Sequence, residues 1–314
     1  MSRALVSLLL LLGALVAAGC GLGAGERKDG GVTIIVTRDF GSRELGRRAQ
    51  NAIPGGETVM RLLQRGFDVE TRFGGGFVQE INGIAGGRQD GRPVDWFYYV
   101  NGIEAELGAA ERRLSPGDRV WWDHHDWSAA MRVPAVVGAF PEPFRSGRDG
   151  KRLPVRLDCA TSARAACDEV ERRLEEEDVT GTARAAAGSF GGEGLLRIKV
   201  GRWAELRQDP AVRELERGPK ASGVFARPSA AGDAIALLDP DGRTESRLGP
   251  GAGLVAATAL GGEAPTWIVT GTDTVGVAAA AAQLTQSALR DRFAIAVEDG
   301  RATPLPLVPE TEAP

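Results

Sequence analysis

The side chains best suited to chemistry gather in one short segment of the chain. Four of the six Trp, both Tyr and both His lie between residues 96 and 127. Large aromatic rings that stay accessible form ligand-binding surfaces, and an imidazole can ligate a metal. The candidate ligand-binding residues in this segment are Trp96, Tyr98, Tyr99, Asn101, Trp121, Trp122, His124 and His125.

These aromatics are more numerous than one face of a sheet can bury, because successive side chains of a strand point to opposite faces. One face would carry Trp96, Tyr98 and Val100, and the other Phe97 and Tyr99. Trp121 and Trp122 are split in the same way. Two outcomes are therefore open for one set of these side chains. The set lines an exposed ligand surface, with Tyr99 or Trp122 partly accessible near a domain junction, or another part of the chain covers it. The cover would be the second half of the chain, or Phe140 and Phe144.

The two His lie in the run Asp123-His124-His125-Asp126. Adjacent residues of a strand point apart, so the two imidazoles do not easily chelate one ion together. A His and a carboxylate two residues away supply two ligands, whereas a zinc site needs three or four. We therefore predict no metal site in this run. Axial ligation of cobalt or haem iron by one His, and simple packing of a polar strand end, both stay open.

No catalytic constellation stands out. Gly74-Gly75-Gly76 lacks the Lys-Ser/Thr of a P-loop, and the chain has no Gly-x-Ser-x-Gly elbow of a serine hydrolase. The stretch Thr270–Gly276, between a predicted strand and a predicted helix, offers either a helix cap at Thr272 or Asp273 or an anion site. The sequence therefore predicts a protein that is not an enzyme, and an unrecognised hydrolase in the second half is the least favoured alternative.

The elements that position the aromatic segment form an α+β pattern. Apolar spacing predicts a helix over 58–65, and the pair Asn101-Gly102 predicts a tight hairpin turn, since both of its residues accept positive φ. Predicted strands cover 32–37, 77–81, 94–100, 103–106 and 119–127, and a further strand or hairpin arm lies near 47–50. One helix on a small mixed sheet is the β-grasp plan.

Two motifs make the first half similar to a known family. The run Asp95-Trp-Phe-Tyr-Tyr-Val-Asn-Gly102 is followed by Leu114-Ser-Pro-Gly-Asp-Arg-Val-Trp121. Together with the preceding helix they resemble the transcobalamin-like C-terminal family, whose bacterial members were long catalogued as a domain of unknown function. The resemblance covers about 32–127 and implies a β-grasp sheet. In animal members this sheet closes over a corrinoid held against a helical domain, so a cobalamin-like corrinoid is the first ligand it implies, although that helical domain is missing here.

A second domain is predicted after a linker rich in Pro and Gly. We expect a β-grasp domain over 32–138, the linker over 139–151, an α/β layered domain over 152–300 and a disordered tail over 301–314. Strands alternating with helices predict the layered domain. We recognise no family for it.

The N-terminus predicts export and anchoring. A short apolar core over 4–18 is typical of a signal peptide, and Ala17-Ala18-Gly19-Cys20 resembles a bacterial lipobox. We expect removal of 1–19, acylation of Cys20 with palmitate-type chains, and a flexible Gly-rich tether over 20–31. The protein would be extracytoplasmic and held on the cell membrane.

An exported chain meets an oxidising compartment, where disulfides persist. Cys159 and Cys167 are the two other Cys, and they flank what reads as a strand end and a helix start. We predict a disulfide between them, with a pair of buried thiols as the alternative.

The overall charge argues against nucleic acid as a partner, since the formal net charge is −4. The leading hypothesis is a membrane-anchored surface lipoprotein that binds a small ligand, a corrinoid-like cofactor or a glycan, without catalysis. The alternative is a structural or adhesive envelope protein whose β-grasp domain contacts other proteins. An envelope protein or an uptake transporter is a candidate partner in either case.

Overall fold

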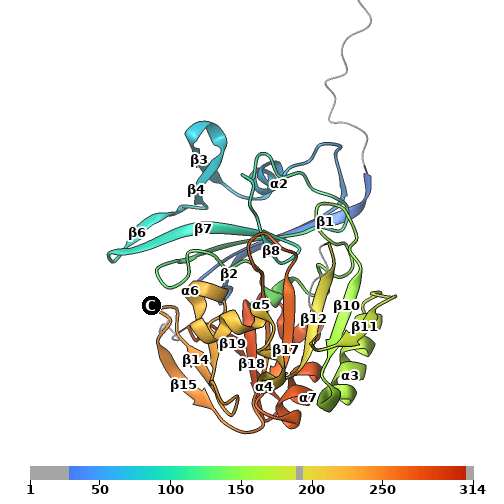
Figure 1. Ribbon diagram of the computed structural model, residues 1–314. Helices are drawn as coiled ribbons and strands as arrows, with labels where there is room; N and C mark the ends of the chain where they lie inside the picture. The colour runs from blue at the N-terminus through green and yellow to red at the C-terminus, as the bar shows by residue number, and fades with distance from the viewer. Residues whose placement is uncertain (1–27, 189–193, 309–314) are drawn as a thin grey trace, which may run out of the picture.

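The computed structural model describes residues 28–188 and 194–308 of the chain (Figure 1). It is built from two main sheets, which lie one above the other in this view, and two small three-stranded sheets. The mixture of helices and strands confirms the predicted α+β class. No helix in the described ranges is long and apolar enough to cross a membrane.

The first sheet has the order β2-β1-β9-β7-β6, with β8 paired to the end of β7. Its strands are β1 Lys28–Arg38, β2 Arg43–Ile53, β6 Gly87–Gln89, β7 Arg92–Val100, β8 Ile103–Glu104 and β9 Arg119–Asp126. The parallel pairing of β1 with β9 brings the first and last strands of this unit together at the centre of the sheet. This is the predicted β-grasp arrangement, hereafter the β-grasp unit.

Helix α2 (Val59–Gly66) covers one face of that sheet. Its first turn is capped by the side chain of Thr58, which accepts a hydrogen bond from the Arg61 amide. Its buried side chains are Val59, Met60, Leu62 and Leu63. A small sheet of β3 (Val69–Arg72), β4 (Phe77–Ile81) and β5 (Ile84–Ala85) follows the helix. The predicted tight turn is present, with φ of 56° at Asn101 and 75° at Gly102.

The second sheet has the order β11-β10-β12-β17-β16-β18-β19. Its strands are β10 Val155–Cys159, β11 Ala183–Ala186, β12 Leu196–Arg202, β16 Gly253–Thr258, β17 Thr266–Gly271, β18 Ala294–Glu298 and β19 Arg301–Leu305. The first four strands in this order are parallel, and the remaining pairings are antiparallel. We call residues 153–308 the second unit.

Both faces of the second sheet are covered, as is usual for a sheet that contains parallel strands. Helices α3 (Arg164–Glu175) and α7 (Thr274–Ala282) pack on one core. The opposite core includes the small sheet β13 (Ala226–Pro228), β14 (Ile235–Leu238) and β15 (Thr244–Leu248), together with side chains of the β-grasp unit. Short helices complete the unit: α4 Trp203–Leu206, α5 Pro210–Arg213, α6 Pro219–Ser222 and α8 Gln286–Leu289.

Two segments differ from the expectation. The connection 139–151 is packed rather than free, because Phe140 and Phe144 are buried against Trp267 of the second sheet. Residues 301–308 of the predicted disordered tail are ordered, because β19 pairs with β18 and Leu305 is buried. Pro is tolerated in this segment because β19 is an edge strand, in which not every backbone amide has to donate a hydrogen bond to a neighbouring strand. The rest of the predicted tail lies outside the described residues.

Candidate functional site

The aromatic residues of β7 and β9 divide between two faces as the alternation predicts. Trp96, Tyr98 and Trp122 lie in the core beneath α2, whereas Tyr99 and Trp121 lie in the core shared with the second unit. Tyr98 stacks on Trp122 with ring centroids 4.8 Å apart. The side chains therefore lie on the faces that were expected. Whether the second face can bind a ligand depends on what covers it.

The second face is covered by the second unit. The Phe293 ring, just before β18, lies edge-on to Tyr99 at 5.7 Å and to Trp121 at 5.2 Å between centroids. Phe40, after β1, contacts both Phe293 and Phe225. The expectation that Tyr99 or Trp122 would be partly accessible is wrong, since their exposures are 0% and 2%.

The physical reason is that the second unit covers this face. Cover by the second half of the chain was one of the outcomes that the alternation of side chains left open. Apolar rings of the second unit remove the spare aromatic face from water, and Phe140 and Phe144 pack elsewhere. The sheet face that carries Tyr99 and Trp121 is therefore closed off from solvent. Here Phe225 and Phe293 fill it, so a flat cofactor does not fit between the two units as they stand.

Glycine permits the close approach of the two units. Gly41 has a φ of 78°, and a Cβ there would collide with the backbone carbonyl of Asp291. A Cβ at Gly138 would likewise meet the Arg292 amide and the ring of Trp121. Arg47 adds an ion pair to Asp291 across the same contact. The two units therefore form one packed body.

Asp123 organises a buried polar network behind these rings. Its carboxylate accepts hydrogen bonds from the Phe40 amide (3.1 Å) and the Gly41 amide (2.8 Å). It also accepts from the Thr37 hydroxyl and from Nδ1 of His125 (2.8 Å). Four donors compensate the cost of burying this charge, as a buried carboxylate requires.

The two His point to opposite faces, as predicted. The His125 ring is sandwiched between Phe40 and Phe97, with centroids 4.5 Å from each. Nε2 of His124 lies 3.2 Å from the Ala85 carbonyl, and burial lowers the pKa of this imidazole. Both rings are buried, and no group of three or more metal-ligating side chains forms within the ranges that the structure describes.

Asn101 has a structural contact set. Its side chain donates to Asp118 Oδ1 (2.8 Å) and to the Gly147 carbonyl (3.1 Å), and it accepts from the Arg119 amide (2.9 Å). Burial raises the pKa of the Asp118 carboxyl. The candidate binding residue therefore fixes the hairpin turn to the connection between the two units.

Two aromatic side chains of this segment each bury a polar atom that has no hydrogen-bond partner in the described structure: the Tyr99 hydroxyl and Nε1 of Trp122. Burial raises the pKa of the Tyr99 phenol well above its usual value, and the nearby Glu104 and Asp123 add to this effect. An unsatisfied buried hydroxyl destabilises the fold. These atoms have no access to solvent and therefore offer no present binding surface.

An open cleft lies instead at the edge of the junction between the two units. It has a volume of about 730 Å³, within the range of small-molecule sites. Its charged lining includes Arg148, Lys151, Arg197, Asp209 and Glu263, and Leu153, Leu260 and Ala264 add apolar surface. We call it the junction cleft. No local sequence pattern indicates this cleft, because its lining comes from the connection, from β12, from the start of α5 and from the loop 259–264.

Arg148 ties the junction cleft to both units. Its guanidinium lies 3.6 Å from Glu106 of the β-grasp unit and donates to the Gly262 carbonyl of the second unit at 3.4 Å. It also borders two smaller cavities that continue along the junction. In contrast, no ion pair to Lys151 or Glu263 is present in the described structure, and both residues are exposed. One free charge of each sign therefore lines the cleft.

Buried charges stand behind one wall of the cleft. Nζ of Lys199 is fully buried, 3.0 Å from both Asp158 and Asp209. Arg197 pairs with Asp209 at 3.2 Å, and Arg156 pairs with Asp158 at 2.6 Å. The sequence signal for this network is the presence of two cations, Arg197 and Lys199, at alternate positions of a strand whose two faces are both buried. Such pairing holds Asp209 and Arg197 in place at the cleft wall.

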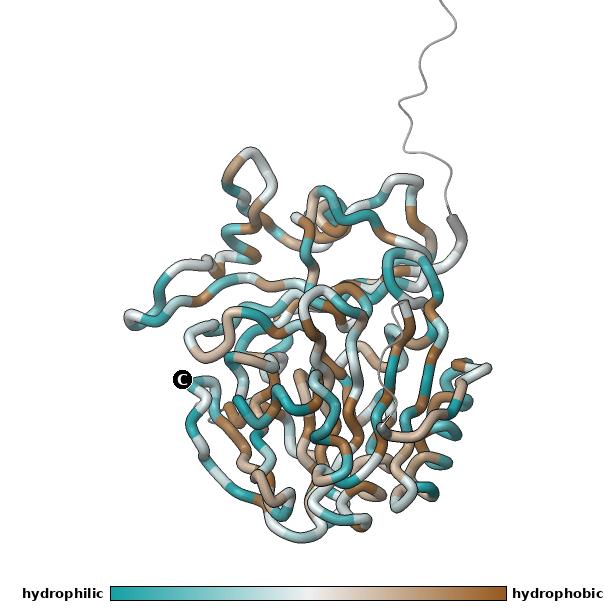
Figure 2. The backbone as a smooth tube through the Cα atoms, viewed as in Figure 1, coloured by the Kyte–Doolittle hydropathy of each residue, from teal (hydrophilic) through white to brown (hydrophobic). Residues whose placement is uncertain are grey.

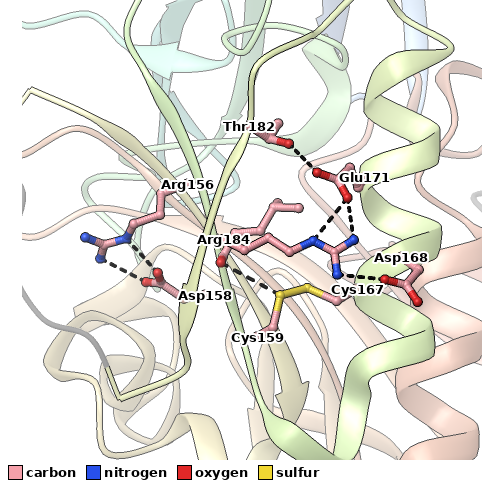
Figure 3. The surroundings of a disulfide bond; sticks show 9 residues. Arg156, Asp158, Cys159, Cys167, Asp168, Glu171, Thr182 and Arg184 are labelled. Atoms are coloured by element: carbon pink, nitrogen blue, oxygen red, sulfur yellow. Dashed lines mark hydrogen bonds and ion pairs between the residues drawn. A yellow bond between two sulfur atoms is a disulfide. The ribbon is translucent and has the colours of Figure 1, made fainter.

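The predicted disulfide between Cys159 and Cys167 is confirmed (Figure 3). The Cα atoms are 6.1 Å apart, within the usual span of the bond. Figure 3 shows Arg184 of the edge strand β11 beside it, paired with Asp168 and Glu171 of α3. The disulfide and these pairs join the end of β10, α3 and β11.

The Thr270–Gly276 stretch has the capping role. Asp273 accepts hydrogen bonds from the Gly276 amide (2.9 Å) and the Gly251 amide (2.8 Å). Hydrogen bonding to these amides lowers the pKa of this carboxyl. Its own carboxylate thus occupies the start of α7, where an external anion would bind.

Comparison with known proteins adds one family match. Residues 56–126 match the domain of unknown function DUF4430. This segment runs from just before α2 to the end of β9, inside the region that resembles the transcobalamin-like family. A search of curated proteins gives no match.

Two solved structures are similar over about a third of the chain. One is a proposed metal-binding protein of Ruminococcus gnavus ATCC 29149, with 14% identity and a TM-score of 0.25, covering 31% of this chain and 98% of that one. The other is haptocorrin in complex with Cbi, with 16% identity and a TM-score of 0.26, covering 35% of this chain and 28% of that one. The chain thus spans little more than a quarter of the haptocorrin chain.

Proposed function

We propose that the protein is a membrane-anchored, extracytoplasmic lipoprotein that binds a small ligand without catalysis, and that the ligand occupies the junction cleft. The anchor is the proposed acylated Cys20, which lies outside the described residues. The observation that carries the binding proposal is a cleft at the junction that presents a free cation, a free carboxylate and apolar surface together.

The lining favours a ligand of stated chemistry. Lys151 recognises an anionic group and Glu263 a cationic group, while Leu153 and Leu260 contact an apolar body. A small zwitterion with an apolar side chain combines these features. Binding sites commonly pair apolar walls with a few convergent polar groups that fix orientation.

The aromatic segment is assigned a different role. Its second face joins the β-grasp unit to the second unit, so the contacts that the alternative hypothesis gave to another protein are made within this chain. The corrinoid and the glycan become competing probes, and an uptake transporter stays a proposed partner for a ligand-loaded lipoprotein.

A thermal-shift panel tests the proposal. The probes are free leucine, cobinamide, haemin and a chito-oligosaccharide, each added to the purified exported chain. A ligand at about 100 times its Kd stabilises the folded state by about 2.7 kcal/mol, which is readily measured. We expect leucine to raise the Tm.

Variants then locate the site. Lys151→Ala and Glu263→Ala should each abolish the leucine shift without lowering the Tm of the free protein, because both side chains are exposed. Arg301→Ala, exposed on β19 and outside the cleft, is the matched control and should retain the shift. No shift with leucine, or a shift that survives both cleft variants, would overturn the proposed site. A shift with cobinamide alone would restore the corrinoid hypothesis.

A further inference from the structure

The hairpin of β3 and β4 exposes aromatic side chains at its tip. Phe73 is 87% exposed and Phe77 is 36% exposed, and the two rings lie 6.2 Å apart across the turn Gly74–Gly76. Phe73 has a φ of 52°, a left-handed conformation that bulky residues rarely adopt. The turn therefore holds a large apolar ring out in solvent, where burial of the same ring would be favourable.

A second apolar residue lies beside this tip. A Cβ on Gly108 would be 3.4 Å from the Gly76 carbonyl, so the loop that carries Leu107 contacts the hairpin turn. Leu107 is 53% exposed. Three of the five large hydrophobic residues exposed in the described structure thus gather here, and we call Phe73, Phe77 and Leu107 the apolar tip. Contiguous exposed apolar groups mark contact surfaces.

The position of the tip indicates what it contacts. Figure 1 shows the β3–β4 hairpin and the start of β1 at the same end of the molecule, opposite α7. Figure 2 shows hydrophobic residues on that projecting hairpin. Eight residue steps separate Cys20 from Lys28. At about 3.5 Å per step, a bilayer anchor at Cys20 lies within about 28 Å of the start of β1.

We propose that the apolar tip inserts into the headgroup region of the bilayer that anchors the chain. The inference rests on the lipid anchor of the proposed function, and it adds a second point of contact that orients the body on the membrane. Aromatic rings favour the membrane–water interface. Exposed Arg72 adjoins the tip, and Glu70 and Glu80 face each other further along the hairpin, so the hairpin carries charges of both signs and the surface it fits is zwitterionic.

The test uses the whole exported chain from residue 20 with a hexahistidine tag before it. Cys20→Ser removes the acylation site and the remaining free thiol, since Cys159 and Cys167 are bridged. Gly76→Cys carries an NBD fluorophore, because Gly76 has a φ of −79° and room for a Cβ. The protein is bound to phosphatidylcholine vesicles that contain a nickel-chelating lipid.

On these vesicles we expect a blue shift of NBD emission and a loss of quenching by aqueous iodide. The double variant Phe73→Ser/Phe77→Ser should lose both effects while its CD spectrum and Tm are unchanged. The matched control Val275→Ser, which is 67% exposed on α7, should retain them. NBD emission on the vesicles that equals emission in solution, or that is the same in the double variant, would overturn the proposal.

The nickel lipid replaces the native anchor in this experiment. A failure of acylation at Cys20 would therefore leave the result intact, and a failure of the apolar tip would leave the anchor untouched. Leucine binding in the junction cleft is measured separately and does not depend on either.

Discussion

Truncation of Phe293 should separate a structural aromatic face from a ligand-binding one. Its ring is 3% exposed and contacts Phe40, Tyr99, Trp121 and His125, with centroids 5.2 to 5.7 Å away. Phe293→Ala removes the ring from the centre of the core that both units share. Buried Phe→Ala changes cost about 3–5 kcal/mol, because apolar transfer and a residual cavity both contribute. We expect a loss in that range.

Urea unfolding followed by tryptophan fluorescence measures this loss. Because the β-grasp unit and the second unit share this core, the wild-type protein should unfold in one cooperative transition, and the variant in one transition at lower urea or in two. Val275→Ala, on the exposed side of α7, is the control and should change the free energy of unfolding by less than about 0.5 kcal/mol. A cost below about 1 kcal/mol for Phe293→Ala would refute the claim that this face is a packed interface.

Four further predictions follow from individual residues. Tyr99→Phe removes a buried hydroxyl without a partner, so the free energy of unfolding should stay equal or rise by up to about 1 kcal/mol; a loss above about 2 kcal/mol would show a hidden partner. Cys20→Ser should abolish metabolic fatty-acid labelling, and persistent labelling would contradict the lipobox. Mass spectrometry after alkylation without reduction should find Cys159 and Cys167 unmodified, and reduction should destabilise the fold by about 2 kcal/mol for so short a loop. Burial lowers the pKa of His124 in the folded state below its ordinary value of 6.5, so the unfolded state takes up a proton first as the pH falls. The stability that neutral, buried His124 contributes is therefore complete above pH 6.5 and is lost as the pH falls below 6.5. His124→Gln should flatten the dependence of Tm on pH between about 7 and 5.

Local sequence signals predicted much of the β-grasp unit. The apolar spacing of α2, the turn at Asn101-Gly102 and the alternation in β7 each act within a few residues, so α2 and the long strands β1, β4, β7 and β9 followed from local patterns, whereas the short strands β3, β5 and β6 were not predicted. The disulfide followed from the small number of Cys in a chain that the sequence predicts to be exported. The faces of Trp121 and Trp122 followed from the two-residue period of a strand.

What covers those faces could not be predicted in the same way. Phe293 lies more than 160 residues beyond Trp121 in the chain, and no local pattern indicates which residues will meet across the junction. The junction cleft has the same origin, since Lys151 and Glu263 become neighbours of one cavity only through tertiary packing. The pairing of β19 was missed because a Pro-rich composition does not distinguish an edge strand from a free tail.

Hydrogen exchange of the purified chain with and without saturating leucine tests the central claim most directly. Ligand in the junction cleft should slow amide exchange in the peptides that contain 148–153 and 259–264 and leave those of β7 and β9 unchanged. The Glu263→Ala variant should show no leucine-dependent change in either region. Protection that appears in β7 and β9 instead, with none at 148–153 or 259–264, would contradict the account and return ligand binding to the aromatic segment.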